Sequence, residues 1–264
     1  MASRLPNTEP NDGGASLAVD FDLRPAENRV TRYILSWSAP RWRGGGKPWA
    51  TSGELYTHMY HKHYPDAAAT ARLLARNHGD LLRRVLAWQE VLYGDPTTRG
   101  WLADSLINAL YLIPEAGMWA QAGAPLPDWV REEDGLFGMN ECPRTCPQIE
   151  CIPCGFYGNL PLVYFCPELI LSTYRGYKGH AYDDGAPPWV WGGWTGGTPP
   201  VDFVRPAKGY QWATNGISLA AMLDRYDLCW GDRDPDFVKE FHPLIKKNMI
   251  YTVNLRTSGE YTVG

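Results

Sequence analysis

The longest regular pattern in the sequence is a helical one between Asp66 and Tyr93. Asp66 is suited to cap its first turn, because a carboxylate there can accept a hydrogen bond from a backbone N–H. Such a long amphipathic helix commits much of the chain to helical packing and requires a partner for its apolar face. Apolar side chains recur at helical spacing with arginines between them, namely Leu73, Leu74, Leu81, Leu82, Val85, Leu86 and Trp88 alternating with Arg72, Arg76, Arg83 and Arg84.

Four further segments carry helical patterns, so the chain is predicted to be mainly α-helical. Pro114 should end or kink the first of them, and Asp234 or Asp236 can cap the last. Two long connections separate these helices, and connections of that length are usually functional or disordered. The helices are expected over residues 102–113, 160–174, 216–229 and 235–255, and the long loops over 122–154 and 176–213.

The segment from Leu17 to Trp37 alternates apolar and polar residues on either side of a turn at 25–28. Alternation with period two is typical of strands, so this segment is predicted to be a strand pair. Taken with the helices, it suggests a small β region in front of a helical toroid or solenoid whose loops gather on one face.

Charge and hydropathy exclude several functional classes. The 264 residues carry 25 Lys and Arg against 29 Asp and Glu, with no large basic cluster, so a nucleic-acid partner is not expected. No apolar run is long enough to be an integral membrane segment. The polar residues 1–14 do not have the pattern of a secretory signal, so a cytoplasmic location is expected. Motifs of nucleotide-binding proteins, serine hydrolases and zincins are absent from the sequence.

Aromatic side chains make up 13% of the chain, alongside 27 Gly and 22 Pro. Rings with a polar edge suit ligands that are flat-faced and rich in hydroxyl groups, of which sugars are one kind, although rings also serve simply as core. Tyr157, Trp191 and Trp194, in or beside the two long loops, are the candidates for stacking on a saccharide.

Cysteines and histidines form two groups that resemble metal ligands. Cys142, Cys146, Cys151 and Cys154 fall within one loop, and thiolates at this spacing could hold zinc or an iron–sulfur cluster. Prolines interleave these cysteines, and the alternative we favour from the sequence is thiols packed in the loop without metal or other cofactor. For the second group we favour packing of polar aromatics over metal binding, since its members, His58, His61 and His63, alternate with tyrosines.

Carboxylates are the more informative set. Glycosidic cleavage needs two of them, one ionised and one protonated. Six acidic residues lie at helix ends or in the two long loops, although each can also serve as a cap, an ion-pair partner or a solvated side chain. They are Asp104, Glu115, Glu141, Glu150, Asp183 and Asp184.

Several stretches, taken in order, resemble glycoside hydrolase family 116, which includes bacterial β-glucosidases and the non-lysosomal glucosylceramidase. The resemblance spans about Val30 to Arg256 and rests on order and spacing. It implies a β-sandwich followed by an (α/α)6 barrel with a retaining exo-β-glycosidase site. The stretches are Leu35–Arg41, Leu55–Thr57, Tyr64–Ala67, Trp88–Gln89, Asp104–Tyr111 and Phe156–Asn159.

The chain departs from the family pattern at two places. Ala109 occupies the position where the family's β-glucosidases carry the nucleophilic glutamate. Either Glu115, Glu141 or Glu150 has taken over that role, or the chain belongs to a divergent branch with another mechanism. By the resemblance, the acid/base aspartate would fall beyond Gly264.

A six-hairpin toroid also needs two helices for each hairpin, and only about five helices are predicted here. Residues 1–50 are therefore expected to be the end of a β-sandwich domain with its linker. Residues 51–264 are expected to be the first part of a toroid, inactive by itself.

The leading hypothesis is a family 116-like catalytic region that hydrolyses β-linked glucosides or xylosides in its full-length form. Glu115 and Glu150, followed by Glu141 and Asp104, are the candidate catalytic residues. The alternative is a carbohydrate-binding or scaffold module of the same fold that has lost its chemistry. The oligomeric state is left open.

Overall fold

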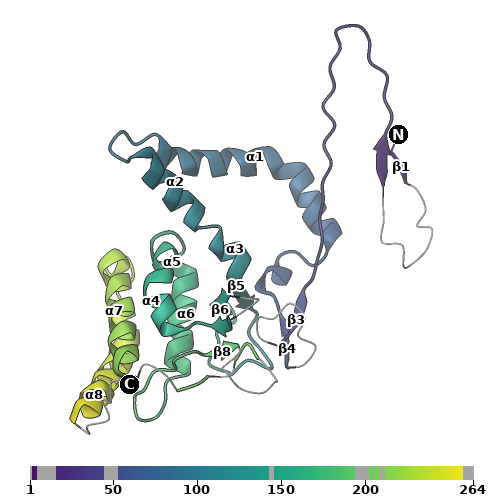
Figure 1. Ribbon diagram of the computed structural model, residues 1–264. Helices are drawn as coiled ribbons and strands as arrows, with labels where there is room; N and C mark the ends of the chain where they lie inside the picture. The colour runs from purple at the N-terminus through teal and green to yellow at the C-terminus, as the bar shows by residue number, and fades with distance from the viewer. Residues whose placement is uncertain are drawn as a thin grey trace.

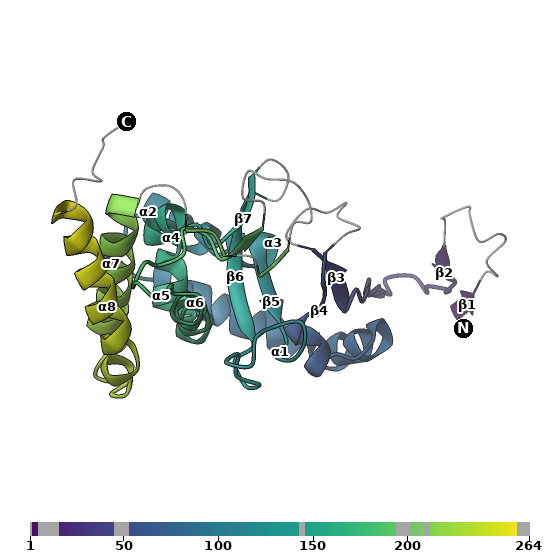
Figure 2. The ribbon, with the colours of Figure 1, turned by 90° about the horizontal axis from the view of Figure 1, so that it is seen from below.

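The computed structural model describes residues 2–4, 16–44, 53–142, 146–193, 202–204, 206–208 and 212–257. About half of the chain is helical, with small antiparallel sheets (Figure 1). Helices α4 to α8 gather on one side of a four-stranded sheet, and α1 and α2 extend away from them (Figures 1 and 2). Trp194 lies outside the described residues.

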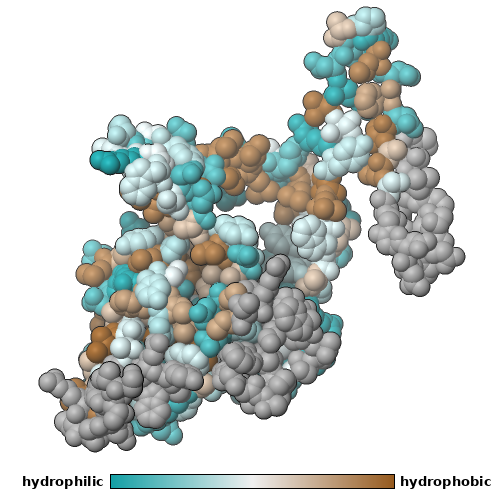
Figure 3. Space-filling view, in the orientation of Figure 1, coloured by the Kyte–Doolittle hydropathy of each residue, from teal (hydrophilic) through white to brown (hydrophobic). Residues whose placement is uncertain are grey.

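The long helix predicted after Asp66 is confirmed as α1 (Ala67–Tyr93). Asp66 caps it, with the carboxylate accepting a hydrogen bond from the Ala69 N–H at 2.6 Å. None of its residues is buried, and its apolar stripe faces outward over much of its length (Figure 3). An edge-on contact between Trp88 and Phe165 connects α1 to helix α5.

The helix predicted over 102–113 is two helices, α2 (Gly100–Ala109) and α3 (Leu112–Ala116). Pro114 lies in the first turn of α3, where its missing N–H has no partner to lose, so it does not end the helix. The helix predicted over 160–174 is likewise divided into α5 (Leu160–Phe165) and α6 (Pro167–Gly179). Pro167 causes this break, because proline cannot continue a preceding helix but can begin a new one.

The prediction of a long loop over 122–154 is wrong. This segment contains β6 (Leu136–Cys142), β7 (Cys146–Ile149) and the start of α4 (Ile152–Gly158). The strands join β5 (Gly117–Ala120) and β8 (Gly192–Gly193) in the order β5-β6-β7-β8. The loop predicted over 176–213 is interrupted by β8 and begins only after α6 ends at Gly179.

The strand pair predicted between Leu17 and Trp37 is also wrong. β2 (Leu17–Val19) pairs with β1 (Ala2–Arg4), and residues 20–40, all of them described, form no strand. The turn is present, with the Glu27 N–H donating to the Arg24 carbonyl. An alternating segment forms a strand only where its backbone pairs with another strand and its apolar side chains are buried. Here the side chains of Val30 and Leu35 remain exposed.

A second hairpin crosses the domain boundary expected at residue 50. β3 (Arg41–Arg43) pairs with β4 (Leu55–Thr57), and the 3-10 helix η1 (Met59–Lys62) follows. Tyr56 of β4 packs in the same cluster as Leu136, Ile149 and Trp191. The hairpin is therefore connected to the four-stranded sheet through side chains.

The main hydrophobic core lies between the sheet and the helices. α7 (Trp212–Trp230) and α8 (Phe237–Thr257) agree with the predicted helices and follow each other through a short connection. Hydroxyl groups fasten α6 to β6, since Ser172 Oγ accepts from the Phe137 N–H at 2.9 Å and Thr173 donates to the Phe137 carbonyl at 3.0 Å. The buried core includes Ile170, Tyr174, Leu219, Met222, Tyr226 and Phe241.

Candidate functional site

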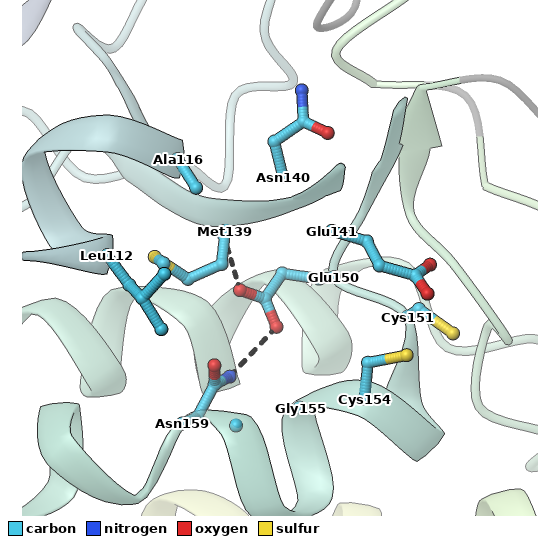
Figure 4. A pocket seen from close by; sticks show the side chains of 11 residues that line it. Leu112, Ala116, Met139, Asn140, Glu141, Glu150, Cys151, Cys154, Gly155 and Asn159 are labelled. Carbon is cyan, nitrogen blue, oxygen red and sulfur yellow. Dashed lines mark hydrogen bonds between the residues drawn. The ribbon is translucent and has the colours of Figure 1, made fainter. Parts of the chain in front are cut away.

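The β6–β7 hairpin, α3 and α4 enclose a pocket of about 150 Å³ (Figure 4). Leu112 and Ala116 of α3 form one apolar wall, and the start of α4 forms the opposite one. The pocket is of interest because two glutamates lie in a lining that contains few other charged groups. The residues that line it are Leu112, Ala116, Met139, Asn140, Glu141, Glu150, Cys151, Cys154, Gly155, Gly158 and Asn159.

Glu150 occupies the turn between β7 and α4, and its side chain is directed into the pocket wall (Figure 4). Only 2% of the residue is exposed. Its backbone has a φ of 52°, in the left-handed region that non-glycine residues rarely adopt. Such backbone conformations persist where surrounding contacts enforce them, and they cluster at functional sites.

Three donors hold the Glu150 carboxylate in place. The Met139 N–H donates to Oε1 at 2.6 Å, and the Asn159 side-chain amide donates to Oε2 at 3.1 Å. The Tyr177 hydroxyl lies 3.3 Å from Oε2 and donates to the Glu150 backbone carbonyl at 2.8 Å. These donors come from β6, α4 and α6, so three elements fix the position of one carboxylate.

Burial dominates the electrostatics of Glu150. Loss of solvent raises the pKa of this carboxyl group to about 7, although the hydrogen bonds from Met139, Asn159 and Tyr177 favour the charged form and act in the opposite direction. Burial and the adjacent Glu150 together raise the pKa of Tyr177 well above its ordinary value. The Tyr177 hydroxyl therefore acts here as a neutral hydrogen-bond donor.

Glu141 lies at the outer edge of the same pocket, near the end of β6. Glu141 is exposed to solvent, and its carboxylate faces Cys151 and Cys154 (Figure 4). One carboxylate oxygen of Glu141 and the sulfur atoms of these two cysteines lie within 4.8 Å of one another. Cys146 of β7 lies with its Sγ 3.5 Å from Glu141 Oε2.

The other predicted carboxylates lie outside the pocket lining. Glu115 is exposed on α3, whereas Leu112 and Ala116 of that helix face the pocket. Asp104 is exposed on α2 and accepts a hydrogen bond from the Tyr93 hydroxyl of α1 at 2.8 Å. Ala109, at the end of α2, is not among the lining residues either. Asp183 is exposed, and the exposed Asp184 pairs with Lys208.

Trp191 and Tyr157 do not line the pocket. Trp191 is 1% exposed and stacks on Tyr177, with ring centroids 5.7 Å apart, so it has no face available to a saccharide. Its ring fits against Gly138 of β6 and Gly176 of α6, where an added Cβ would lie 2.5 Å and 1.2 Å from ring atoms. Tyr157 is largely exposed and contacts Phe156 edge-on.

The histidines after β4 pack as aromatic side chains. His58 stacks between Trp42 and Tyr60, and burial lowers its pKa. Among the described residues, the group with metal-ligand spacing consists of Glu141, Cys151 and Cys154 and includes none of these histidines.

Asn159 and Tyr177 were not among the candidate functional residues. Asn159 follows Glu150 by nine positions and ends α4, so a helix-terminal amide near a buried acid is a local signal for it. Tyr177 has no such signal, because only the packing of α6 on the sheet brings it to Glu150.

No model of a known protein family matches the chain, and no curated protein matches it closely enough to count as a relative. Within the described residues, no helix is both long enough and apolar enough to span a membrane.

Proposed function

We propose that the chain is the catalytic region of a glycoside hydrolase similar to family 116, acting on β-linked glucosides or xylosides. One observation carries the proposal. A buried glutamate, Glu150, is held by three donors in a left-handed backbone conformation, in a pocket that a second glutamate, Glu141, also lines.

Two carboxylates in different surroundings are what glycosidic cleavage requires. One group protonates the leaving oxygen, and the other acts as nucleophile or as base on the opposite side of the sugar ring. Burial among Met139, Gly155 and Asn159 suits Glu150 to the proton-donating role. Glu141 reaches water and suits the second role, which does not then depend on the residue at position 109.

The pocket dimensions support binding of a single terminal sugar residue. Its volume of about 150 Å³ is small, and its lining combines apolar side chains with the side-chain amide of Asn159 and the two glutamates. The cleaved bond would lie toward the open edge, where Glu141 is exposed.

We propose further that the helices belong to an (α/α)6 toroid. The support is the succession of α7 and α8 through a short connection and their packing, with α4 to α6, around a shared core. In this arrangement α1 and α2 would supply another hairpin of the ring, which accounts for the exposed apolar side chains of α1.

The test is hydrolysis of 4-nitrophenyl β-glucoside and β-xyloside by the purified chain, with the α-glucoside as the stereochemical control. We expect β-selective turnover, in contrast to the inactivity expected from the sequence, which has Ala109 at the nucleophile position, an acid/base residue beyond Gly264 and an incomplete toroid. Glu150→Gln should reduce kcat at least about 100-fold, since it removes general acid catalysis while keeping the shape of the side chain. Glu132→Gln, on an exposed loop, is the matched control and should leave kcat unchanged.

Turnover and saccharide binding, measured side by side, separate a hydrolase from a binding module. Saccharide binding without turnover, measured by calorimetry, would support a carbohydrate-binding protein instead. Equal kcat for Glu150→Gln and the unaltered chain would overturn the role of Glu150, and absence of both binding and turnover would overturn the saccharide site.

A further inference from the structure

Three potential metal ligands, Glu141, Cys151 and Cys154, lie close together at the edge of the pocket, and a fourth, Cys146, lies beside Glu141. Glu141 and Cys146 come from the two strands of the β6–β7 hairpin, and Cys151 and Cys154 from the start of α4. Cys151 is the N-cap residue of α4 and Cys154 lies in the first turn, so both are at the end of the helix beside the hairpin. Figure 4 shows both sulfur atoms on the side where Glu141 lies.

The spacing of these atoms fits tetrahedral coordination. A Zn–S bond of about 2.3 Å places two sulfur ligands of a tetrahedral zinc about 3.8 Å apart. The Glu141 oxygen and the sulfurs of Cys151 and Cys154 are all within 4.8 Å of one another, so small side-chain rotations close the remaining gap. Cys146 Sγ lies 3.5 Å from Glu141 Oε2 but is not within 4.8 Å of all three of these atoms, so its side chain has to rotate to supply the fourth ligand.

The charges of this group also favour a cation. None of the described residues that line the pocket is Lys, Arg or His. A metal dication would supply positive charge to this group and stabilise its thiolates.

The ligand types select among metals. Thiolates bind Zn²⁺ strongly, whereas Ca²⁺ and Mg²⁺ require sets of oxygen ligands. Three thiolates and one carboxylate complete a four-coordinate zinc site. The hairpin and the helix would then be joined through the metal, next to the turn that holds Glu150.

We propose that Cys146, Cys151, Cys154 and Glu141 bind one Zn²⁺ at the edge of the pocket. Each cysteine binds as a thiolate, so binding releases the three thiol protons to solvent, and the carboxylate binds without proton transfer. This assignment differs from the sequence expectation of packed thiols because only the fold brings Glu141 to the cysteines.

The site has a regulatory consequence that rests on the proposed hydrolase function. Glu141 cannot serve as second carboxylate of the reaction while it is a zinc ligand. Bound Zn²⁺ should therefore inhibit turnover, and a chelator should restore it.

The test is titration of the fully reduced chain with Zn²⁺ by calorimetry, and with Co²⁺ as a spectroscopic probe. We expect one Zn²⁺ per chain. Co²⁺ should give a thiolate-to-metal charge-transfer band together with the intense visible bands of tetrahedral coordination. Cys151→Ser/Cys154→Ser should abolish both the stoichiometric binding and the charge-transfer band.

Two further variants keep the test independent of folding defects. Glu141→Gln changes an exposed residue and should weaken Zn²⁺ binding at least about tenfold while the charge-transfer band persists. Cys229→Ser alters a thiol that packs against the core, away from the site, and should bind Zn²⁺ like the unaltered chain.

The proposal is overturned if the reduced chain binds no stoichiometric Zn²⁺, or if Cys151→Ser/Cys154→Ser binds it as tightly as Cys229→Ser. These results do not depend on glycosidase activity. Tight Zn²⁺ binding by a chain without turnover would support the metal site while contradicting the hydrolase.

Discussion

The side-chain amide of Asn159 donates a hydrogen bond to Glu150 Oε2 across 3.1 Å, joining the end of α4 to the turn that precedes it. Both residues are buried. Gly155, between them in α4, leaves the necessary room, since an added Cβ would lie 3.1 Å from Asn159 Nδ2 and 3.4 Å from Glu150 Oε2. The amide thus holds the carboxylate in position from the pocket lining.

We expect Asn159→Ala to lower the free energy of unfolding by about 1–3 kcal/mol, because it removes one partner of a buried polar group. Urea denaturation followed by circular dichroism measures this. Asn108→Ala is the matched control, since its amide bonds to a backbone carbonyl on an exposed helix surface, and we expect a change within about 0.5 kcal/mol. Equal effects of the two substitutions would contradict the structural role of Asn159.

Gly176→Ala should destabilise the chain strongly, because the new methyl group would overlap the Trp191 ring at 1.2 Å. Overpacking of a core typically lowers the free energy of unfolding by about 1–3 kcal/mol, and this overlap should place the loss at or above the upper end. Gly79→Ala in α1 meets no atom within 4 Å and should instead stabilise the helix by up to about 1 kcal/mol. Thermal unfolding of the pair measures both changes, and a harmless Gly176→Ala would refute the Trp191 packing.

The pH dependence of stability should include a contribution from Glu240. Burial alone would raise the pKa of this carboxyl group, but hydrogen bonds and charge from Arg175, together with Arg131 and Lys178, lower it below its ordinary value of 4.5. Because the pKa is lower in the folded state, the contact of ionised Glu240 with Arg175 stabilises the fold above pH 4.5. This stabilisation is lost as the pH falls through the pKa of the folded state and Glu240 is protonated.

Glu240→Gln should therefore be less stable than the unaltered chain at neutral pH, and the difference should shrink as the pH falls below 4.5. Urea denaturation at a series of pH values checks this. Arg175 donates to Glu240 through two nitrogen atoms, at 3.1 and 3.0 Å, so the substitution removes a bidentate charged contact, while the contact of Arg175 with Asp134 at 2.7 Å remains. A pH-independent difference would show that the ion pair contributes nothing to the acid transition.

Apolar side chains on α1 and in the core should respond differently to truncation. Leu219 of α7 is fully buried, and Leu219→Ala should lower the free energy of unfolding by about 2–5 kcal/mol. Leu86 of α1 is 54% exposed, and Figure 3 shows apolar surface along this part of the molecule. Leu86→Ala should change the free energy of unfolding by no more than about 0.5 kcal/mol. A large loss for Leu86→Ala would show that the apolar face of α1 is covered in solution.

The helices were largely predictable because their signals are local. Asp66 and the apolar spacing after it specify α1, and α7 and α8 follow from the same periodicity. The sequence prediction missed the breaks at Leu110 and Cys166, because the apolar spacing runs across both of them, although Pro167 marks the second.

The sheet and the pocket depended on contacts between distant residues. β6 and β7 come from a segment whose prolines and cysteines resemble a loop, and only pairing with β5 and β8 satisfies their backbone groups. The sequence could therefore suggest four candidate carboxylates, but it could not show which of them share a pocket. The structure places Glu141 and Glu150 in one pocket lining and leaves Glu115 and Asp104 outside it.

The sequence by itself determined where the long helices α1, α7 and α8 form, which residues could carry charge or bind metal, and that no long apolar segment exists. Tertiary structure alone decided that Trp191 is core, that Tyr177 reaches Glu150, and that Glu141 meets Cys151 and Cys154. The physical reason is range: capping and periodicity act within a few residues, whereas burial and hydrogen bonding to a side chain depend on every element packed around it.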